Sequence, residues 1–343
     1  MMPRTMAALR REITRLGECG GRPLATLYLG GGTPSLLPLA QLEALLECVG
    51  QRFPLAPGAE VTLEANPDDV TSVQVEAWDR LGITRVSVGC QSFDDRVLAY
   101  LNRRHDARQA ENAVQTLLAR GLEVSLDLMI GLPGLSEEQL SATLATVCRL
   151  RPQHVSVYLL EMDKPHALGR LALRRPDLFP DADIAARHYL VVGRTLVGAG
   201  YRHYEISNFA LPGHAARHNL RYWLRQPVLA AGLGAHGSSG RQRWANLDDL
   251  AAYLGAVEAG RAPLAWSRRL SDVEVIKERV MLGLRLARGS HSELVKRVAA
   301  DTPDFGRRVE EFLALGLLRE RGGRVRLVPR GFLLSNELLA ALW

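Results

Sequence analysis

The sequence predicts an α/β fold: a partial (β/α) barrel of the TIM type, followed by a small α+β domain. Apolar, β-branched runs alternate with amphipathic helical segments through about residue 200, and the pattern changes near residue 266. Strands that alternate with helices build a parallel sheet with right-handed crossovers. A Rossmann fold is not favoured, because no GxGxxG motif follows a strand and opens a helix.

Five strands are expected in the barrel, and each is interpreted as apolar on both faces. An amphipathic helix precedes the first strand, and helical stripes of apolar residues separate the others. Asp106 is expected to cap one of these helices and Gly121 to end it, while Ser136 and Gln139 form the capping box of the next. The strands are expected at residues 25–30, 60–65, 85–89, 123–130 and 154–160.

The C-terminal part has the element order of a winged-helix domain. A capping box over Ser271 and Glu274 opens its first helix, and Gly322-Gly323 marks the turn of a hairpin. The expected elements are helices over about 271–287, 291–300 and 304–315, a hairpin over 317–328, and a last helix from Ser335.

We therefore expect three regions. Residues 1–200 form the barrel core, and residues 266–343 form the winged-helix-like domain. Residues 201–265 connect them and are rich in His, Tyr, Asn and Gly, with little helical periodicity near their start. Long irregular stretches in compact proteins tend to be functional.

Composition indicates an ordinary globular protein, with 47% hydrophobic and 23% charged residues. No apolar run approaches the length of a membrane-spanning helix, and the N-terminus does not resemble a signal peptide, so we expect a cytoplasmic location. The net charge of +6 comes from arginines spread along the chain. Biased base composition of the gene explains such a charge, and so does an anionic partner such as a porphyrin carboxylate or nucleic acid.

Polar or glycine-rich motifs stand at the ends of four expected strands. In a parallel barrel the C-terminal strand ends carry function. The glycines of 30–32 allow close approach of a ligand to backbone N–H groups, while Glu64, Asp127 and Gln91 add two carboxylates and an amide. Together they suit a zwitterionic or hydroxyl-rich ligand. The motifs are GGGTPS at 30–35, EANP at 64–67, GCQSF at 89–93 and DLMIGLP at 127–133.

Long motifs give the chain a family resemblance. YLGGGTPS, LEANPDD, RVSVGCQSFDDRVLAYLNRRHD and SLDLMIGLPG resemble the core of the oxygen-independent coproporphyrinogen III oxidase family, whose members are radical S-adenosylmethionine (SAM) proteins. YEISNFA, RHNLRYW and GLGAHG resemble its haem-chaperone branch, HemW. The resemblance extends from about residue 5 to the C-terminus and implies a partial barrel of the radical SAM type.

The resemblance also implies residue roles. His218 is the expected haem ligand, since imidazole ligates haem iron and is released on protonation, here expected near pH ~6.5. The alternative is that His218 is a structural hydrogen-bonding residue, with His214 and His236 as weaker ligand candidates. The expected SAM-binding residues are Gly31, Gly32, Thr33, Glu64, Gln91, Arg103 and Asp127, and the expected haem-binding residues are His218, Asn219, Tyr222 and Trp223.

One departure from the family pattern concerns the iron–sulfur cluster. Members carry CxxxCxxC after the first barrel strand, and these thiolates hold a [4Fe–4S] cluster. That segment would lie upstream of Met1, so we expect that the given sequence lacks the first strand and has no metal site of its own. Its four cysteines, Cys19, Cys48, Cys90 and Cys148, are too far apart to replace the motif.

The implied function is a haem chaperone that delivers haem to target proteins, with SAM and the cluster bound in the full-length protein. The alternative in the same family is oxidative decarboxylation of coproporphyrinogen III to protoporphyrinogen IX, which needs the SAM-derived radical and is not expected of this chain. A third possibility is nucleic-acid binding through the arginines of residues 320–326. It is not favoured, because no aromatic platform accompanies them and the preceding helix carries Glu310 and Glu311.

Overall fold

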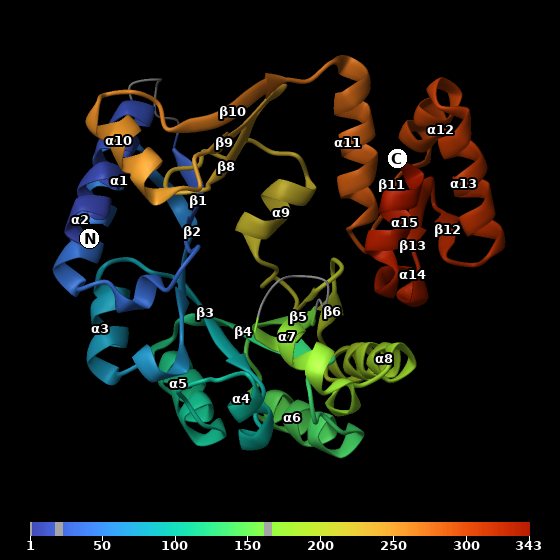
Figure 1. Ribbon diagram of the computed structural model, residues 1–343, viewed down its shortest axis with the longest axis horizontal. Helices are drawn as coiled ribbons and strands as arrows, with labels where there is room; N and C mark the ends of the chain where they lie inside the picture. The colour runs from blue at the N-terminus through green and yellow to red at the C-terminus, as the bar shows by residue number, and fades with distance from the viewer. Residues whose placement is uncertain (1, 18–22, 161–166) are drawn as a thin grey trace.

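The computed structural model describes residues 2–17, 23–160 and 167–343, and a curled seven-stranded sheet forms its centre (Figure 1). The strand order is β1-β2-β3-β4-β5-β7-β6. Strands β1 to β5 run parallel, and the short β7 and β6 add antiparallel pairings at one edge. This sheet confirms the predicted partial barrel. The strands are β1 (Leu24–Leu29), β2 (Leu55–Ala65), β3 (Arg85–Gln91), β4 (Glu123–Ile130), β5 (His154–Leu159), β6 (Arg202–His203) and β7 (Asn208–Ala210).

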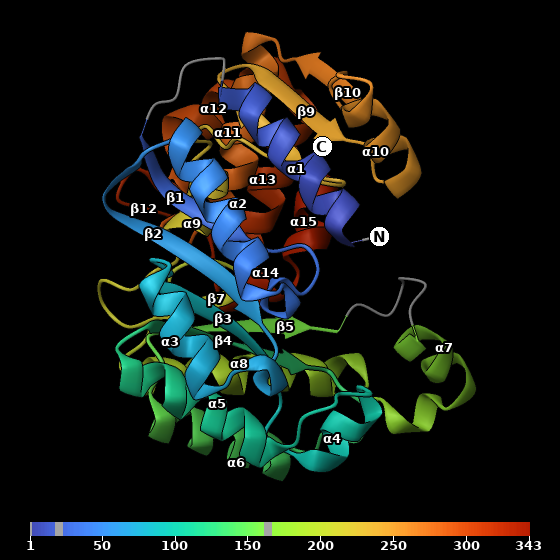
Figure 2. The same cartoon turned by 90° about the vertical axis from the view of Figure 1, so that its left-hand side faces the viewer.

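Helices cover the convex face of the sheet, as the alternating pattern predicts (Figures 1 and 2). The Asp106 side chain caps α5, Gly121 ends it in the left-handed region at φ 87°, and Ser136 and Gln139 form the capping box of α6. The helices of this part are α1 (Met2–Gly17), α2 (Leu39–Arg52), α3 (Ser72–Arg80), α4 (Asp95–Tyr100), α5 (Ala107–Arg120), α6 (Glu137–Leu150), α7 (Ala167–Arg174) and α8 (Ala182–Gly198), with short 3-10 turns at Pro34–Leu36, Pro67–Asp69 and Pro176–Leu178.

The two faces of the sheet differ, so the expectation of strands apolar on both faces is wrong. On the convex face, Leu63, Val86 and Leu126 are fully buried in the main core. The alternate positions of the same strands are polar and line a cavity on the concave face. A strand sends successive side chains to opposite faces, so one strand serves both a core and a polar site.

Elements from the connecting region pack against the barrel core. Helix α9 (Arg217–Trp223) contacts β1, although the sequence had indicated irregular structure there. A second sheet has the order β10-β9-β8, and α10 (Leu250–Glu258) packs against α1 (Figure 2). The buried carboxylate of Glu12 on α1 accepts hydrogen bonds from the Tyr253 hydroxyl, the Asn246 side-chain amide and the Gly232 backbone N–H. These bonds hold α10 and β9 to α1. The strands are β8 (His236–Ser239), β9 (Gln242–Asn246) and β10 (Leu264–Arg269).

The C-terminal elements confirm the predicted winged-helix-like order. Ser271 and Glu274 form the expected capping box, and the hairpin turns at Gly322-Gly323. A short third strand, β11, joins the hairpin through β13. No helix in the described ranges is long and apolar enough to cross a membrane. The elements are α11 (Asp272–Leu284), β11 (Ser290–His291), α12 (Ser292–Asp301), α13 (Pro303–Ala314), β12 (Leu318–Arg321), β13 (Arg324–Leu327), α14 (Pro329–Leu333) and α15 (Ser335–Leu342).

Candidate functional site

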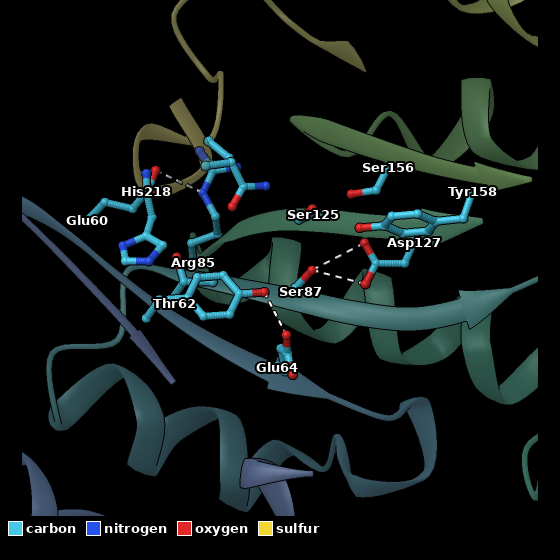
Figure 3. Close-up of a pocket in the computed structure, with 13 residues that line it drawn as sticks. Glu60, Thr62, Glu64, Arg85, Ser87, Ser125, Asp127, Ser156, Tyr158 and His218 are labelled. Atoms are coloured by element: carbon cyan, nitrogen blue, oxygen red, sulfur yellow. Dashed lines mark hydrogen bonds and ion pairs between the residues drawn. The ribbon is translucent and has the colours of Figure 1, made fainter. Parts of the chain in front are cut away.

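A polar cavity of about 60 Å³ lies on the concave face of the half-barrel (Figure 3). The parallel register builds it, because it places Glu64 beside Ser87 on the next strand, and Asp127 beside Ser156. These side chains come from β2, β3, β4 and β5 and point to the same side of the sheet. The cavity therefore gathers carboxylates and hydroxyls from strands that are distant in the sequence.

Glu64 is held between the glycine turn and Tyr28. Its carboxylate accepts from the Gly31 backbone N–H at 3.2 Å and from the Tyr28 hydroxyl at 2.8 Å. Burial and the Glu64 charge raise the pKa of Tyr28 far above its ordinary value, so the phenol stays protonated and donates. A Cβ at Gly30 would come within 2.7 Å of the Glu64 carboxyl, so this position needs glycine.

Asp127 lies at the same end of the sheet and has an unusual environment. The Ser87 hydroxyl is 3.2 and 3.1 Å from its two carboxylate oxygens. Burial raises the pKa of Asp127 to about 7, although hydrogen bonds from Ser156 and Ser87 oppose the shift. Both the neutral and the charged form of this carboxyl group are therefore populated near pH 7.

Gln91 and Arg103 complete the rim beside Gly89. The Arg103 guanidinium donates to the Gly89 carbonyl at 2.6 Å and to Asn66 at 3.2 Å. A Cβ at Gly89 would lie 3.0 Å from both the Arg103 and Gln91 side chains, so both pack over this glycine. Burial lowers the pKa of Arg103 from its ordinary value. The structure thus brings Glu64, Gln91 and Asp127 to the C-terminal strand ends, where the sequence places them, and adds Arg103 from the segment after α4.

His218 stands on α9 and lines the same cavity. Its Nδ1 is 2.9 Å from Thr26 Oγ1, and its ring stacks on Tyr28 with centroids 5.1 Å apart. The Tyr222 ring lies edge-on to the imidazole, with ring centroids 5.4 Å apart. Burial, aided by Arg221, lowers the pKa of His218 to about 4. The expected protonation of His218 near pH ~6.5 is therefore wrong, because that value assumed a solvated imidazole.

A buried ion network holds α9 against the sheet. The Glu60 carboxylate accepts the backbone N–H groups of Arg217 at 3.0 Å and His218 at 2.8 Å, which satisfies two donors of the first helical turn. Arg85, only 3% exposed, lies 3.3 Å from Glu60 and 2.5 Å from Glu123. Sequence reasoning missed Glu60 and Arg85. The sequence feature that could have identified them is one acidic and one basic residue, each within an otherwise apolar strand.

The other candidate haem residues have different surroundings. Asn219 lines the cavity, and Tyr222 is 42% exposed. The Trp223 ring lies under the Arg285 guanidinium at 5.4 Å, so it joins α9 to the end of α11. Of the alternative ligands, His214 binds Glu123 through Nδ1 at 2.9 Å. His236 is exposed and meets Trp266 edge-on.

Comparisons with known proteins agree with this architecture. Residues 2–147 match the radical SAM superfamily, and residues 270–334 match the HemN C-terminal domain. The chain is similar in structure to the radical SAM coproporphyrinogen III oxidase HemN of Escherichia coli, with a TM-score of 0.86, 21% identity, and coverage of 98% of this chain and 82% of that one. The chain is thus a radical SAM protein.

Two curated relatives define the family more narrowly. The chain is 37% identical to the haem chaperone HemW of Mycobacterium tuberculosis, over 99% of this chain and 86% of that protein. It is 30% identical to the haem chaperone HemW of Bacillus subtilis, over 97% of this chain and 89% of that protein. The chain belongs to the HemW family.

Radical SAM membership implies SAM and a [4Fe–4S] cluster. The SAM residues fit: a Cβ added at Gly31 or Gly32 would meet nothing within 4 Å, so the glycine turn faces open space beside two carboxylates. The cluster does not fit the described residues, where no three metal-ligating side chains come together. Cys90 is buried and Cys48 and Cys148 are half-buried, while Cys19 lies outside the described residues.

Proposed function

We propose that this chain binds haem through α9 and transfers it to haem-accepting proteins. The observation that carries the proposal is the position of His218, which lines the cavity with its ring held by Thr26 and Tyr28. Burial lowers the pKa of this imidazole to about 4, which favours the neutral form. A neutral imidazole is a common ligand of haem iron. Two curated relatives of the chain are named haem chaperones, which supports the same reading.

Haem needs more room than the cavity offers. At about 60 Å³ the cavity is far smaller than the pockets of roughly 300–1,000 Å³ that enclose drug-sized ligands. The macrocycle therefore has to lie on the open side of α9, where Tyr222 and Leu224 are 42% and 36% exposed. We propose that four residues of α9 contact the macrocycle: His218 and Asn219, which also line the cavity, and Tyr222 and Trp223.

We also propose that the strand-end residues bind SAM. Glu64 suits its ammonium group, the open space in front of Gly31 and Gly32 suits its amino-acid end, and Asp127 suits a ribose hydroxyl. Thr33, Gln91 and Arg103 border this ligand in the proposal. In this class of protein, SAM bound to a cluster supplies a radical, but no step through the cluster is assigned to this chain.

A haem-transfer assay tests the chaperone function. Haem-loaded protein is mixed with increasing concentrations of an apo-haemoprotein, and the transfer rate is followed by the Soret band. A chaperone that hands haem over in a complex gives a rate that rises with acceptor concentration. A rate that stays constant shows simple dissociation and contradicts the proposal. The coproporphyrinogen oxidase alternative predicts loss of carbon dioxide from coproporphyrinogen III under reducing conditions with SAM, and we expect none.

Three further expectations belong to this proposal. We propose that the chain divides into three functional regions, with α9 in the second one. These regions are residues 1–200, 201–265 and 266–343. The cytoplasmic location and the haem-accepting partners remain predictions. Nucleic-acid binding is not favoured, and Arg324 of the hairpin donates to Gly289 and contacts His291 within the C-terminal domain.

A further inference from the structure

Helix α9 has no buried residue, although it lies between β1 of the half-barrel and α11 of the C-terminal domain (Figure 1). It has only 7 residues, so its own backbone hydrogen bonds hold it weakly. Few buried apolar contacts are typical of elements that open locally at a low free energy. The polar contacts at its two ends therefore decide how firmly α9 is held.

The chain is anchored on both sides of this helix. Before it, the His214 imidazole binds Glu123 at 2.9 Å. After it, Val228 and Ser238 exchange two backbone hydrogen bonds of 2.8 Å. Residues 216–225, here named the α9 segment, lie between these anchors. The segment can therefore move while the chain on either side of it stays in place.

The α9 segment forms one wall of the cavity. Ala216, His218 and Asn219 line the cavity, and the other lining residues come from β1 to β5. Thr62 of β2 is one of them and is only 2% exposed. Ladders of backbone hydrogen bonds join the five strands. The α9 segment is therefore the wall that moves with the least disruption.

The C-terminal domain holds the far end of this segment. Arg225 ends it in the left-handed region at φ 54°, and its Nε donates to Glu278 Oε2 of α11 at 2.5 Å. The Arg225 side chain is 7% exposed, so salt screens this pair little. Glu278 also accepts from Arg243 of β9 at 3.0 Å. Directly after α11, the Arg285 guanidinium lies over the Trp223 ring at 5.4 Å.

We propose that the α9 segment is a lid on the cavity and that the C-terminal domain controls its opening through Glu278 and Arg285. When the Arg225–Glu278 pair breaks, Arg243 still pairs with Glu278. The carboxylate thus keeps one cation, and opening costs less than breaking a lone buried pair. The inference concerns access to the cavity, so it goes beyond haem binding and does not depend on it.

Hydrogen exchange of the ligand-free protein, read by mass spectrometry, measures the opening of α9. The informative amides are those of Leu220 and Leu224, which donate within the segment at 3.1 and 2.8 Å. In the wild type they should exchange faster than the amides of β3. Arg225→Met removes a charged hydrogen bond, so we expect exchange at least about tenfold faster in the α9 segment. The matched control, Arg243→Met, removes the other partner of Glu278 and should leave α9 unchanged.

Cysteine labelling measures access to the cavity. Thr62→Cys is suitable, because the Thr62 hydroxyl has no hydrogen-bond partner in the described part of the chain. The probe is methyl methanethiosulfonate, and peptide mass spectrometry separates the introduced thiol from the native ones. We expect labelling at least about tenfold faster when Arg225→Met is added, and no change when Arg243→Met is added. Cys90, fully buried in the main core, is the internal control and should react equally slowly in all three proteins.

Equal exchange of α9 in Arg225→Met and Arg243→Met overturns the inference. Faster exchange without faster labelling shows that the helix moves without closing the cavity, and this also overturns it. If Arg225→Met does not fold, Glu278→Gln takes its place, and wild-type protection of α9 equal to that of β3 still contradicts the lid. Haem is absent from every measurement, so failure of the proposed function and failure of the lid are told apart.

Discussion

The phenol ring of Tyr28 stacks on the imidazole of His218, with centroids 5.1 Å apart and an angle of 26° between the rings. The hydroxyl of the same tyrosine donates to Glu64 at 2.8 Å. One side chain therefore touches both the residue proposed to bind the SAM ammonium and the residue proposed to ligate haem. Glu64 and His218 line one cavity, although α9 follows the barrel strands late in the sequence.

The first prediction concerns pH. Only neutral imidazole ligates iron, and the pKa of His218 is lowered to about 4, mainly by burial with a smaller contribution from Arg221. The unfolded chain takes up this proton near pH ~6.5, so the free energy of unfolding falls as pH drops from there toward 4. The Soret band of the haem complex should persist at pH 5.5 while far-ultraviolet circular dichroism confirms the fold. Loss of the band centred near pH ~6.5 with the fold intact contradicts this.

The second prediction concerns Asp127. Its pKa of about 7 in the folded protein lies above the ordinary value, because burial disfavours the charge. The folded state then binds more protons than the unfolded state between pH ~4 and 7, so stability falls as pH rises through that window. Asp127→Asn should remove this decline, which urea unfolding at pH 5 and pH 8 measures. An equal pH dependence in both proteins would show that the carboxylate is not desolvated.

The third prediction concerns the buried ion network. Arg85→Met leaves the buried Glu60 carboxylate without its cation, and breaking a buried pair in this way costs about 3–5 kcal/mol. The matched control is Arg120→Met, whose exposed pair with Asp79 contributes at most about 1 kcal/mol. Urea unfolding of both variants checks the difference. Similar stabilities would mean that the network does not anchor α9.

The fourth prediction compares two glycines of the same turn. Gly30→Ala places a methyl group within 2.7 Å of Glu64 and Tyr28, so it should lower the unfolding temperature and displace the carboxylate. Gly32→Ala meets no protein atom within 4 Å and should leave stability unchanged. If SAM occupies the space in front of the turn, Gly32→Ala should still weaken SAM binding measured by calorimetry. Unchanged SAM affinity in Gly32→Ala would place the ligand elsewhere.

The sequence predicts much of the barrel, because buried strands and capped helices have local signals. Asp106, Gly121 and the two capping boxes lie where the pattern indicates. The strand-end residues also lie at one rim, since parallel strands all end on the same side. The local pattern does not predict which side chains contact one another on the concave face.

The concave face was missed for a physical reason. Polar residues such as Ser87 and Ser125 sit between large apolar ones, and a run of β-branched neighbours hides their period of two. Arg85 and Glu60 look like isolated charges until the register places their strands side by side. Helix α9 is also too short for an amphipathic stripe, and contacts with Glu60 and Thr26 from distant strands hold it.

The most direct test of the proposed function is a haem titration of three proteins followed by the Soret band: the wild type, His218→Ala and His291→Ala. His291 lies in the C-terminal domain and contacts Arg324, so it serves as the histidine control. The proposed ligand role of His218 predicts a saturable Soret shift in the wild type and in His291→Ala, and its loss in His218→Ala. An unchanged spectrum and affinity in His218→Ala would contradict it, and His214 or His236 would become the next ligand to test.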